Sequence, residues 1–262
     1  MYPPLPDRPG VGSRAGRHRR RFAVFTVLLV VGLAGLAATA VGIAHGVLPR
    51  QFTAAQRRQI STWEMERRWR ALPAGKIFPA SVSYTVPAGD LNASSDLTLQ
   101  AQRLAISPAA SCTGAFAPAA GRVLVQHGCS TVLRATYLDA SGSMVATIAV
   151  AVLPSSSAAS AAYGGLPGTA AGTPGPAGAF PVPGTPAAGF GDADRQLSSG
   201  IAAGPYVIVS TAGFSDDRTQ RLSPANYVSQ EMDSLANGLV TAVQKVLGRP
   251  PPRPVCPGAP GC

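Results

Sequence analysis

The fold of this chain is decided by residues 131–153, which read TVLRATYLDASGSMVATIAVAVL. Two apolar runs, Thr131–Leu138 and Met144–Leu153, flank the polar link Asp139–Ser143, which contains a glycine. Two such runs joined by a short Gly-containing link are typical of an antiparallel β-hairpin. The second run is almost wholly apolar, so we expect it to be a central strand covered on both faces.

Alternating patterns on the N-terminal side of this hairpin predict further strands. The alternating apolar positions are Val82, Tyr84 and Val86 in one run and Leu97, Leu99 and Ala101 in the next. A period of two places these side chains on one face of a sheet. Residues 123–126 form a short apolar run, which we also assign to a strand.

Two more strands and a closing helix are predicted on the C-terminal side. The strands are Ile201–Ala203 and Tyr206–Thr211, and Ser223 followed by Pro224 is a typical helix start. Apolar residues then recur every three or four positions as far as Gly248, which predicts a helix with one apolar face. The apolar positions are Val228, Met232, Leu235, Leu239, Val243 and Val246.

Residues 77–248 are therefore predicted to form an α+β domain. A mainly antiparallel sheet of about five or six strands would be packed by the C-terminal amphipathic helix. Residues 154–200 contain seven Pro and ten Gly, and a short helix is predicted near the start of this range, at Ser155–Tyr163. Such a composition is expected to bury too little apolar surface to offset its ordering entropy. We therefore predict a long, flexible Gly/Pro/Ala-rich insertion at about 164–195.

The net charge of +10 is concentrated near the amino end. Residues 1–21 and 50–76 each carry an excess of five positive charges, whereas residues 77–262 hold nine basic and nine acidic side chains. A nucleic-acid-binding domain would carry its basic side chains on the folded body, so no nucleic-acid partner is expected. Positive charge on both sides of one apolar segment instead suits anionic lipid headgroups.

Residues 22–48 are predicted to form a transmembrane helix. From Phe22 to Ile43 there are 22 residues without an acidic or basic side chain, and as a helix they would span about 33 Å, enough for a hydrocarbon core of about 30 Å. Only this stretch is long and apolar enough to cross a bilayer, so a polytopic transporter is not expected. We expect the basic tail 1–21 to be cytoplasmic and the C-terminal domain extracytoplasmic. The arginines expected to contact membrane lipid are Arg17, Arg19, Arg20 and Arg21.

The predicted transmembrane helix would act as an uncleaved signal anchor. The alternative is a signal peptide that is cleaved from the mature protein. Ala38 and Ala40 form an A-x-A site behind an apolar run, which is typical of cleavage near Ala40. The run continues through Val47 and Leu48, which favours the anchor.

Residues 49–76 are predicted to contain a juxtamembrane helix, and residues 249–262 form a Pro-rich tail. Thr53 and Gln56 form a capping box at the start of the helix. Its tryptophans and arginines suit a helix on the lipid headgroups, while a solvated stalk is the other interpretation.

Four cysteines follow the apolar segment, which indicates disulfides in an oxidising compartment. Three pairings are open, and Cys112 with Cys129 is preferred. Cys256 with Cys262 would then close a small loop in the tail.

No catalytic constellation stands out, and no cofactor or metal site is assigned. His127 lies two residues before Cys129, but a Cys–His dyad would need that cysteine to be free. A zinc site at these residues and Cys112 lacks a fourth ligand. Asp192 and Asp194 could contact a cation, but solvated turn residues are the favoured interpretation.

The layout of the chain resembles that of uncharacterised actinobacterial single-pass membrane-anchored proteins. The likeness rests on the arginine cluster, the single span, the apolar strand leading into SSSAA at 155–159, the strand YVIVSTAG at 206–213 and the closing helix. It covers roughly residues 15–247 and carries over no functional residue. The disulfide-bearing sensor domains of actinobacterial Ser/Thr kinases are similar more distantly, but 21 residues before the span cannot hold a kinase.

The expected function is that of a membrane-tethered, extracytoplasmic binding or accessory protein of the cell envelope, without enzymatic activity. Its partner would be an envelope protein or ligand that the sequence does not identify. The alternative is an exported enzyme, of the hydrolase class, released by signal cleavage near Ala40.

Overall fold

The computed structural model describes residues 52–91, 94–169, 173–216, 218–219 and 227–249. The predicted cytoplasmic tail, the predicted transmembrane helix 22–48 and residues 250–262 lie outside these ranges. Among the described residues, no helix combines the length and the hydropathy needed to cross a bilayer. The membrane span therefore stays a prediction from the sequence.

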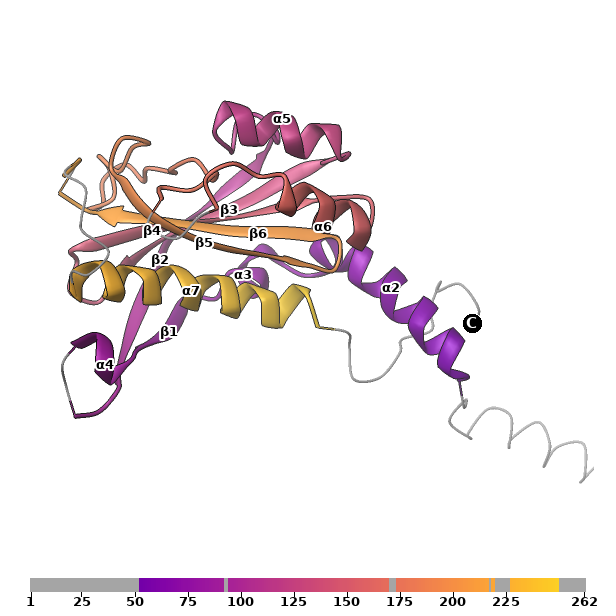
Figure 1. The fold of residues 1–262 in the computed structure, drawn as a ribbon, viewed down its shortest axis with the longest axis horizontal. Helices are drawn as coiled ribbons and strands as arrows, with labels where there is room; N and C mark the ends of the chain where they lie inside the picture. The colour runs from indigo at the N-terminus through magenta and orange to yellow at the C-terminus, as the bar shows by residue number, and fades with distance from the viewer. Residues whose placement is uncertain (1–51, 92–93, 170–172, 217, 220–226, 250–262) are drawn as a thin grey trace, which may run out of the picture. The chain divides into compact units, whose positions relative to one another are not determined.

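Six strands form one antiparallel sheet (Figure 1). They are β1 (Ser81–Val86), β2 (Leu97–Ala110), β3 (Thr131–Asp139), β4 (Met144–Val152), β5 (Arg195–Ala203) and β6 (Tyr206–Phe214). Their order across the sheet is β1-β2-β3-β4-β6-β5, and every neighbouring pair is antiparallel. The predicted α+β fold, with an antiparallel sheet and a C-terminal helix, is confirmed.

The hairpin predicted from residues 131–153 lies at the centre of this sheet. Thr131 of β3 lies opposite Val152 of β4. The Asp139 carboxylate stabilises the turn by accepting hydrogen bonds from the backbone N–H groups of Ser141 (2.8 Å) and Met144 (2.7 Å). All residues of β4 are buried, as predicted for a central strand.

Helix α7 (Tyr227–Leu247) packs on the first face of the sheet. It contacts β1, β4, β5 and β6, so the sheet curves around it (Figure 1). The predicted apolar face is buried at Met232, Leu235, Leu239 and Val243. The buried strand residues of the same cluster include Tyr137, Ile148, Tyr206 and Ile208. Each such large side chain contributes about 1.5–3 kcal/mol when fully buried, and the cluster forms the main core.

Helix α5 (Pro118–Gln126) corrects one prediction. Residues 123–126, which we assigned to a strand, form its last turn. Pro118 lies in the first turn, where a missing N–H breaks no helical hydrogen bond. Ala120 and Leu124 are buried one helical turn apart. A run of four residues, three of them apolar, is too short for its periodicity to separate helix from strand.

Four further helices complete the described structure: α2 (Ala54–Ala71), α3 (Ala74–Ile77), α4 (Ala88–Leu91) and α6 (Ser156–Gly164). The predicted capping box of Thr53 and Gln56 begins α2. Helix α6 is the short helix predicted after the hairpin, and the Ser155 hydroxyl caps it.

The C-terminal half of α2 packs on the sheet. The Tyr206 hydroxyl of β6 donates to the carbonyl of Met65 and accepts from the N–H of Trp69 (3.3 Å). The Trp69 side chain packs against the main core. The sequence suggested either a helix on the lipid headgroups or a solvated stalk. Neither interpretation includes this contact with the sheet.

A row of four hydroxyl side chains crosses the second face of the sheet. Its members are Thr136 of β3, Thr147 of β4, Thr211 of β6 and Ser198 of β5, each opposite the next in the register. The row lies between two apolar clusters of that face, one containing Val209 and the other Val145.

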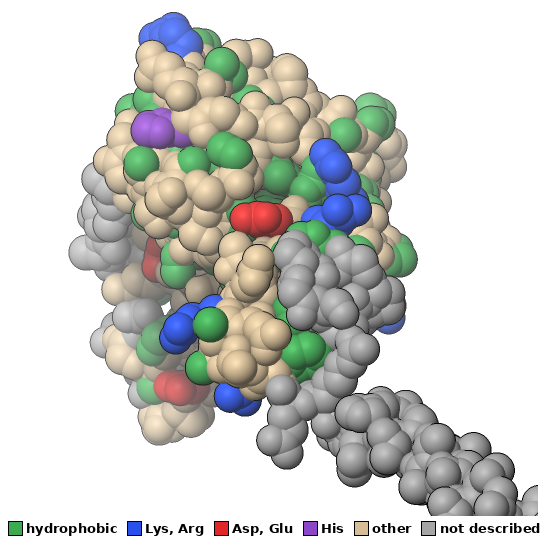
Figure 2. Space-filling view, turned by 90° about the vertical axis from the view of Figure 1, so that its right-hand side faces the viewer, with side chains coloured by type: hydrophobic (Ala, Val, Ile, Leu, Met, Phe, Trp, Pro, Cys, Tyr) green, Lys and Arg blue, Asp and Glu red, His purple; other side chains and the backbone are tan. Residues whose placement is uncertain are grey.

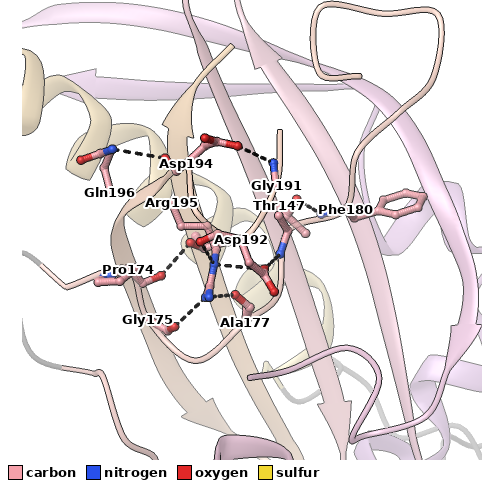
Figure 3. Close-up of polar contacts among 12 residues, drawn as sticks. Thr147, Pro174, Gly175, Ala177, Phe180, Gly191, Asp192, Asp194, Arg195 and Gln196 are labelled. Atoms are coloured by element: carbon pink, nitrogen blue, oxygen red, sulfur yellow. Dashed lines mark hydrogen bonds and ion pairs between the residues drawn. The ribbon is translucent and has the colours of Figure 1, made fainter. Parts of the chain in front are cut away.

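The Gly- and Pro-rich insertion is bound along this hydroxyl row (Figure 3). The N–H of Phe180 donates to Oγ1 of Thr147 (3.0 Å), and its carbonyl accepts from Thr136 (2.6 Å). Thr211 donates to the carbonyl of Pro174 (2.7 Å). The insertion has little secondary structure of its own to pair its backbone N–H and C=O groups. The hydroxyls of the sheet supply hydrogen-bond partners for some of these groups instead.

Arg195, at the start of β5, holds both sides of the insertion together (Figure 3). The side chain is almost fully buried. Its guanidinium donates to the carbonyls of Gly175 (2.8 Å) and Ala177 (2.7 Å) and pairs with the Asp192 carboxylate (3.1 Å).

The expectation that the insertion buries little apolar surface is wrong for residues 173–194. Phe190 and Ala187 are fully buried. The Arg134 guanidinium lies over the Phe180 ring, 5.2 Å from its centroid. The composition of the insertion did not predict how much of its apolar surface is buried. The apolar and hydroxyl partners of this surface lie on the sheet and not in the insertion itself. Flexibility of the segment stays a prediction.

Candidate functional site between β1 and α7

The two edges of the sheet differ in what covers them. At the β5 edge, α6 packs alongside, and the Tyr163 hydroxyl donates to the carbonyl of Gly200 (2.6 Å). At the β1 edge, a groove of about 480 Å³ lies between β1 and α7. An open strand edge offers backbone donors and acceptors to a ligand, so we take this β1–α7 groove as the candidate site.

Small polar side chains line much of the β1–α7 groove. The lining includes Ser83, Tyr84 and Thr85 from β1, and Asp233, Asn237, Thr241 and Lys245 at every fourth position of α7. These four side chains of α7 are exposed. Hydroxyl, amide, carboxylate and ammonium groups make this a surface for hydrogen bonding rather than for apolar contact.

The backbone of β1 contributes directly to the groove. Successive side chains of a strand point to opposite faces, and in β1 they alternate between exposed and buried. Three consecutive residues, Ser83, Tyr84 and Thr85, nevertheless line the groove. They do so through the edge of the strand.

The hydrogen-bond pattern shows which residues of β1 face outward. The carbonyl of Ala80 accepts from the N–H of Arg103 in β2 (2.9 Å), and the register runs without a break to the end of β1. Because an antiparallel ladder alternates, Tyr84 bonds to β2, and Ser83 and Thr85 turn their N–H and C=O groups away from it. Within the described ranges, these outward groups of Ser83 and Thr85 have no hydrogen-bond partner.

The floor of the β1–α7 groove is formed where Gly238 meets Tyr84. The Tyr84 hydroxyl is buried and has no hydrogen-bond partner among the described residues. Burial, followed by the negative charges of Glu231 and Asp139, raises the pKa of Tyr84. Burial and the charge of Asp139 also raise the pKa of Glu231. The hydroxyl therefore stays neutral, as a donor, across the physiological pH range.

Charged side chains mark the two ends of the groove. Helix α7 and β1 run in opposite directions (Figure 1). Consistently, Arg68 of α2, which precedes β1 in the chain, donates to the carbonyl of Arg249 just after α7. Lys245 therefore lies at the end where β1 begins. Asp233, which accepts from the Asn237 amide (2.8 Å), lies at the end where β1 finishes.

A smaller hollow of about 220 Å³ lies where α2 approaches the end of β4 and the start of β3. Glu66, Trp69 and Arg70 line it. The face of the molecule in Figure 2 mixes basic, acidic and apolar side chains. No broad surface of one sign marks a second binding site among the described residues on that face.

The disulfide predicted between Cys112 and Cys129 is present. It joins the segment after β2 to the residues that follow α5. Among the described residues no cysteine is free. The predicted pair of Cys256 and Cys262 lies outside the described residues.

Among the residues that the structure describes, no catalytic pair is brought together at His127. The Cys129 sulfur is bonded to Cys112, so a Cys–His dyad is excluded. In the part of the chain that is described, the His127 imidazole has no hydrogen bond or ion pair. No group of three or more His, Cys, Asp or Glu side chains is arranged there to hold a metal ion.

Asp192 and Asp194 are used within the insertion. Asp192 accepts from the N–H of Ala179 (2.8 Å) and pairs with Arg195. Asp194 is buried and accepts from the N–H of Gly191 (2.8 Å), so the prediction of a solvated turn is wrong for this residue (Figure 3). Both carboxylates stabilise the loop, and the Asp192 side chain also remains largely exposed.

The residues of the β1–α7 groove were not among the site residues predicted from the sequence. A signal for the helix side was present, since the polar positions from Asp233 to Lys245 recur every four residues beside the apolar face. The alternating Ser83 and Thr85 were visible as well. Nothing in the sequence indicated that these two polar stripes lie on the same groove, because their proximity depends on the curvature of the sheet.

Comparison of the chain with protein-family models, curated proteins and solved structures finds no match. The site is therefore interpreted from its geometry and chemistry.

Proposed function

We propose that the protein is a membrane-tethered, extracytoplasmic binding or accessory protein of the cell envelope, and that the β1–α7 groove is its binding site. The apolar segment 22–48 and its flanking arginines support the tether. The Cys112–Cys129 disulfide supports an oxidising compartment.

The observation that carries the binding role is the open edge of β1 inside a polar groove. Its hydroxyl and charged side chains can recognise a ligand through hydrogen bonds, while the Asn237 amide accepts from Ser199 of β5 and donates to Asp233.

Photo-crosslinking in native membranes tests the binding role. A photoreactive amino acid replaces Thr241 in the groove and, as a matched control, Gln126 on α5; both side chains are exposed on helices. We expect a discrete adduct from position 241 and none of that mass from position 126. Identical adducts, or none from position 241, would contradict the proposal.

The intact mass of the chain from the membrane fraction tests the tether. The proposal predicts an uncleaved chain that remains with the membranes after washing at high salt. A mass that begins after Ala40, in a soluble fraction, would instead support an exported protein released by cleavage.

A further inference from the structure

We infer that the β1–α7 groove binds an extended segment of a partner protein, which pairs with β1 as an additional antiparallel strand and carries an acidic side chain near its C-terminal end. This inference rests on the proposed binding function and specifies its ligand.

The backbone of β1 provides the first argument. Ser83 and Thr85 present N–H and C=O groups at the open edge, spaced for a further strand of the ladder. An extended peptide is the ligand whose backbone satisfies both donors and acceptors of such an edge. The opposite edge differs, because α6 and Tyr163 already cover part of β5.

The length of the groove sets the length of the segment. Asp233 and Lys245 mark the charged ends of the groove. They are twelve positions apart on α7, or roughly 18 Å along the helix axis. An extended chain advances about 3.3 Å per residue. The groove therefore holds about five or six residues, comparable with the 6 residues of β1.

For a segment antiparallel to β1, the direction of the strand decides which end meets which charge. A strand antiparallel to β1 runs in the same direction as α7, because α7 and β1 are themselves opposed. Its C-terminal end then lies beside Lys245, where an acidic side chain is favoured. Asp233 lies at the other end and disfavours a second acidic side chain there.

A second copy of this chain is less suited to the edge. Stable dimers bury about 1,200–2,000 Å² with an apolar core. Leu97, Val125 and Tyr227 are the exposed large hydrophobic side chains among the described residues, and none of them lines the groove. The chain's own tail is also a poor occupant, since its prolines lack the N–H groups that a strand requires.

The test uses the full-length chain in lipid nanodiscs and a displayed library of random segments about ten residues long, enough to extend past both ends of β1. Segments are selected on the wild type, on Lys245→Glu and on Arg122→Glu. Arg122 is an exposed residue of α5, so its variant changes the net charge equally at another place. We expect acidic residues near the C-terminal end of segments selected by the wild type and by Arg122→Glu. Lys245→Glu should select basic residues there and weaken the original segments about tenfold.

Amide hydrogen exchange with a selected segment then locates the contact. The amides of Ser83 and Thr85 should become protected, and N-methylation of the segment at alternate residues should abolish binding. Unchanged exchange at Ser83 and Thr85, or the same selected residues on all three variants, would overturn the inference. If the inference fails in this way but position 241 still crosslinks a partner in membranes, the proposed binding function stands. If the crosslink from position 241 is absent as well, the proposed function is also overturned. Dimerisation that buries Thr241 would assign the edge to a second copy and also overturn the inference.

Discussion

Gly238 of α7 lies directly against Tyr84 of β1, so closely that a Cβ atom at position 238 would come within 2.5 Å of the Tyr84 Cβ. A glycine inside a helix costs about 1 kcal/mol relative to alanine. Here the glycine lets the helix approach the edge strand, and this contact forms the floor of the β1–α7 groove.

Replacing this glycine should destabilise the fold. We expect Gly238→Ala to lower the free energy of unfolding by about 1–3 kcal/mol, because overlap with Tyr84 outweighs the gain in helix propensity. Gly164→Ala is the matched control, since a Cβ at position 164 of α6 would meet no atom within 4 Å. Urea unfolding should show that this control is neutral or stabilising. Equal stabilisation by both substitutions would contradict the close packing.

The disulfide should contribute substantially to stability. Replacing both Cys112 and Cys129 by Ala releases a constraint on a separation of 17 residues, and the expected loss is about 3 kcal/mol in the chain-entropy model. Urea unfolding with and without reductant measures it. Reductant should destabilise the wild type and leave the double variant unchanged. A wild type that is insensitive to reductant after full reduction would refute this role.

The hydroxyl row should hold the insertion on the sheet. Thr147→Val removes the acceptor for the N–H of Phe180 and the contact with Thr136 (3.0 Å) while keeping the side-chain shape. We expect a loss of about 1–3 kcal/mol from the unsatisfied buried groups. Limited proteolysis should cut residues 173–194 faster in this variant. Thr98→Val, at an exposed position of β2, is the control and should leave the cleavage rate unchanged.

The raised pKa of Glu231 predicts a pH-dependent stability. Its folded-state pKa lies above the ordinary value of 4.5 because of burial and the charge of Asp139. The protonated carboxyl of Glu231 therefore contributes favourably to the free energy of unfolding below pH 4.5. This contribution is lost as the pH rises through the folded-state pKa of Glu231. Glu231→Gln should therefore stabilise the protein at pH 7 relative to the wild type, and the difference should shrink toward pH 4.

Urea titrations at both pH values measure this difference. Glu66→Gln, at an exposed residue of α2, accounts for the general effect of removing one negative charge. A gain for Glu231→Gln that is the same at both pH values would contradict the raised pKa.

The fold could be predicted from the sequence wherever a pattern was long enough to be specific. The hairpin at 131–153 and the helix leading to Leu247 are examples, because each combines a clear periodicity with recognisable boundaries. The strand prediction for residues 123–126 was wrong because three apolar residues are too few to show a periodicity. The burial of residues 173–194 was mispredicted for another reason, because their hydrogen-bond partners are hydroxyls of distant strands.

The candidate site was harder to predict than the fold. The disulfide followed from the count and position of the cysteines. Ser83 and Lys245, by contrast, share a groove only because the sheet curves around α7. The free backbone groups at the β1 edge have no sequence signal at all, because the order of strands across the sheet decides which strand is outermost.

Accessibility of the groove in intact cells tests the central claim most directly. Thr241→Cys and Gln126→Cys, in a chain with Cys256 and Cys262 replaced by Ser, are labelled with a membrane-impermeant maleimide in cells and after purification. We expect both positions to react from outside the cell. Position 126 should react at the same rate in both preparations, and position 241 should react more slowly in cells, where a partner occupies the groove. Labelling of both positions only after lysis, or equal rates at position 241, would contradict the account.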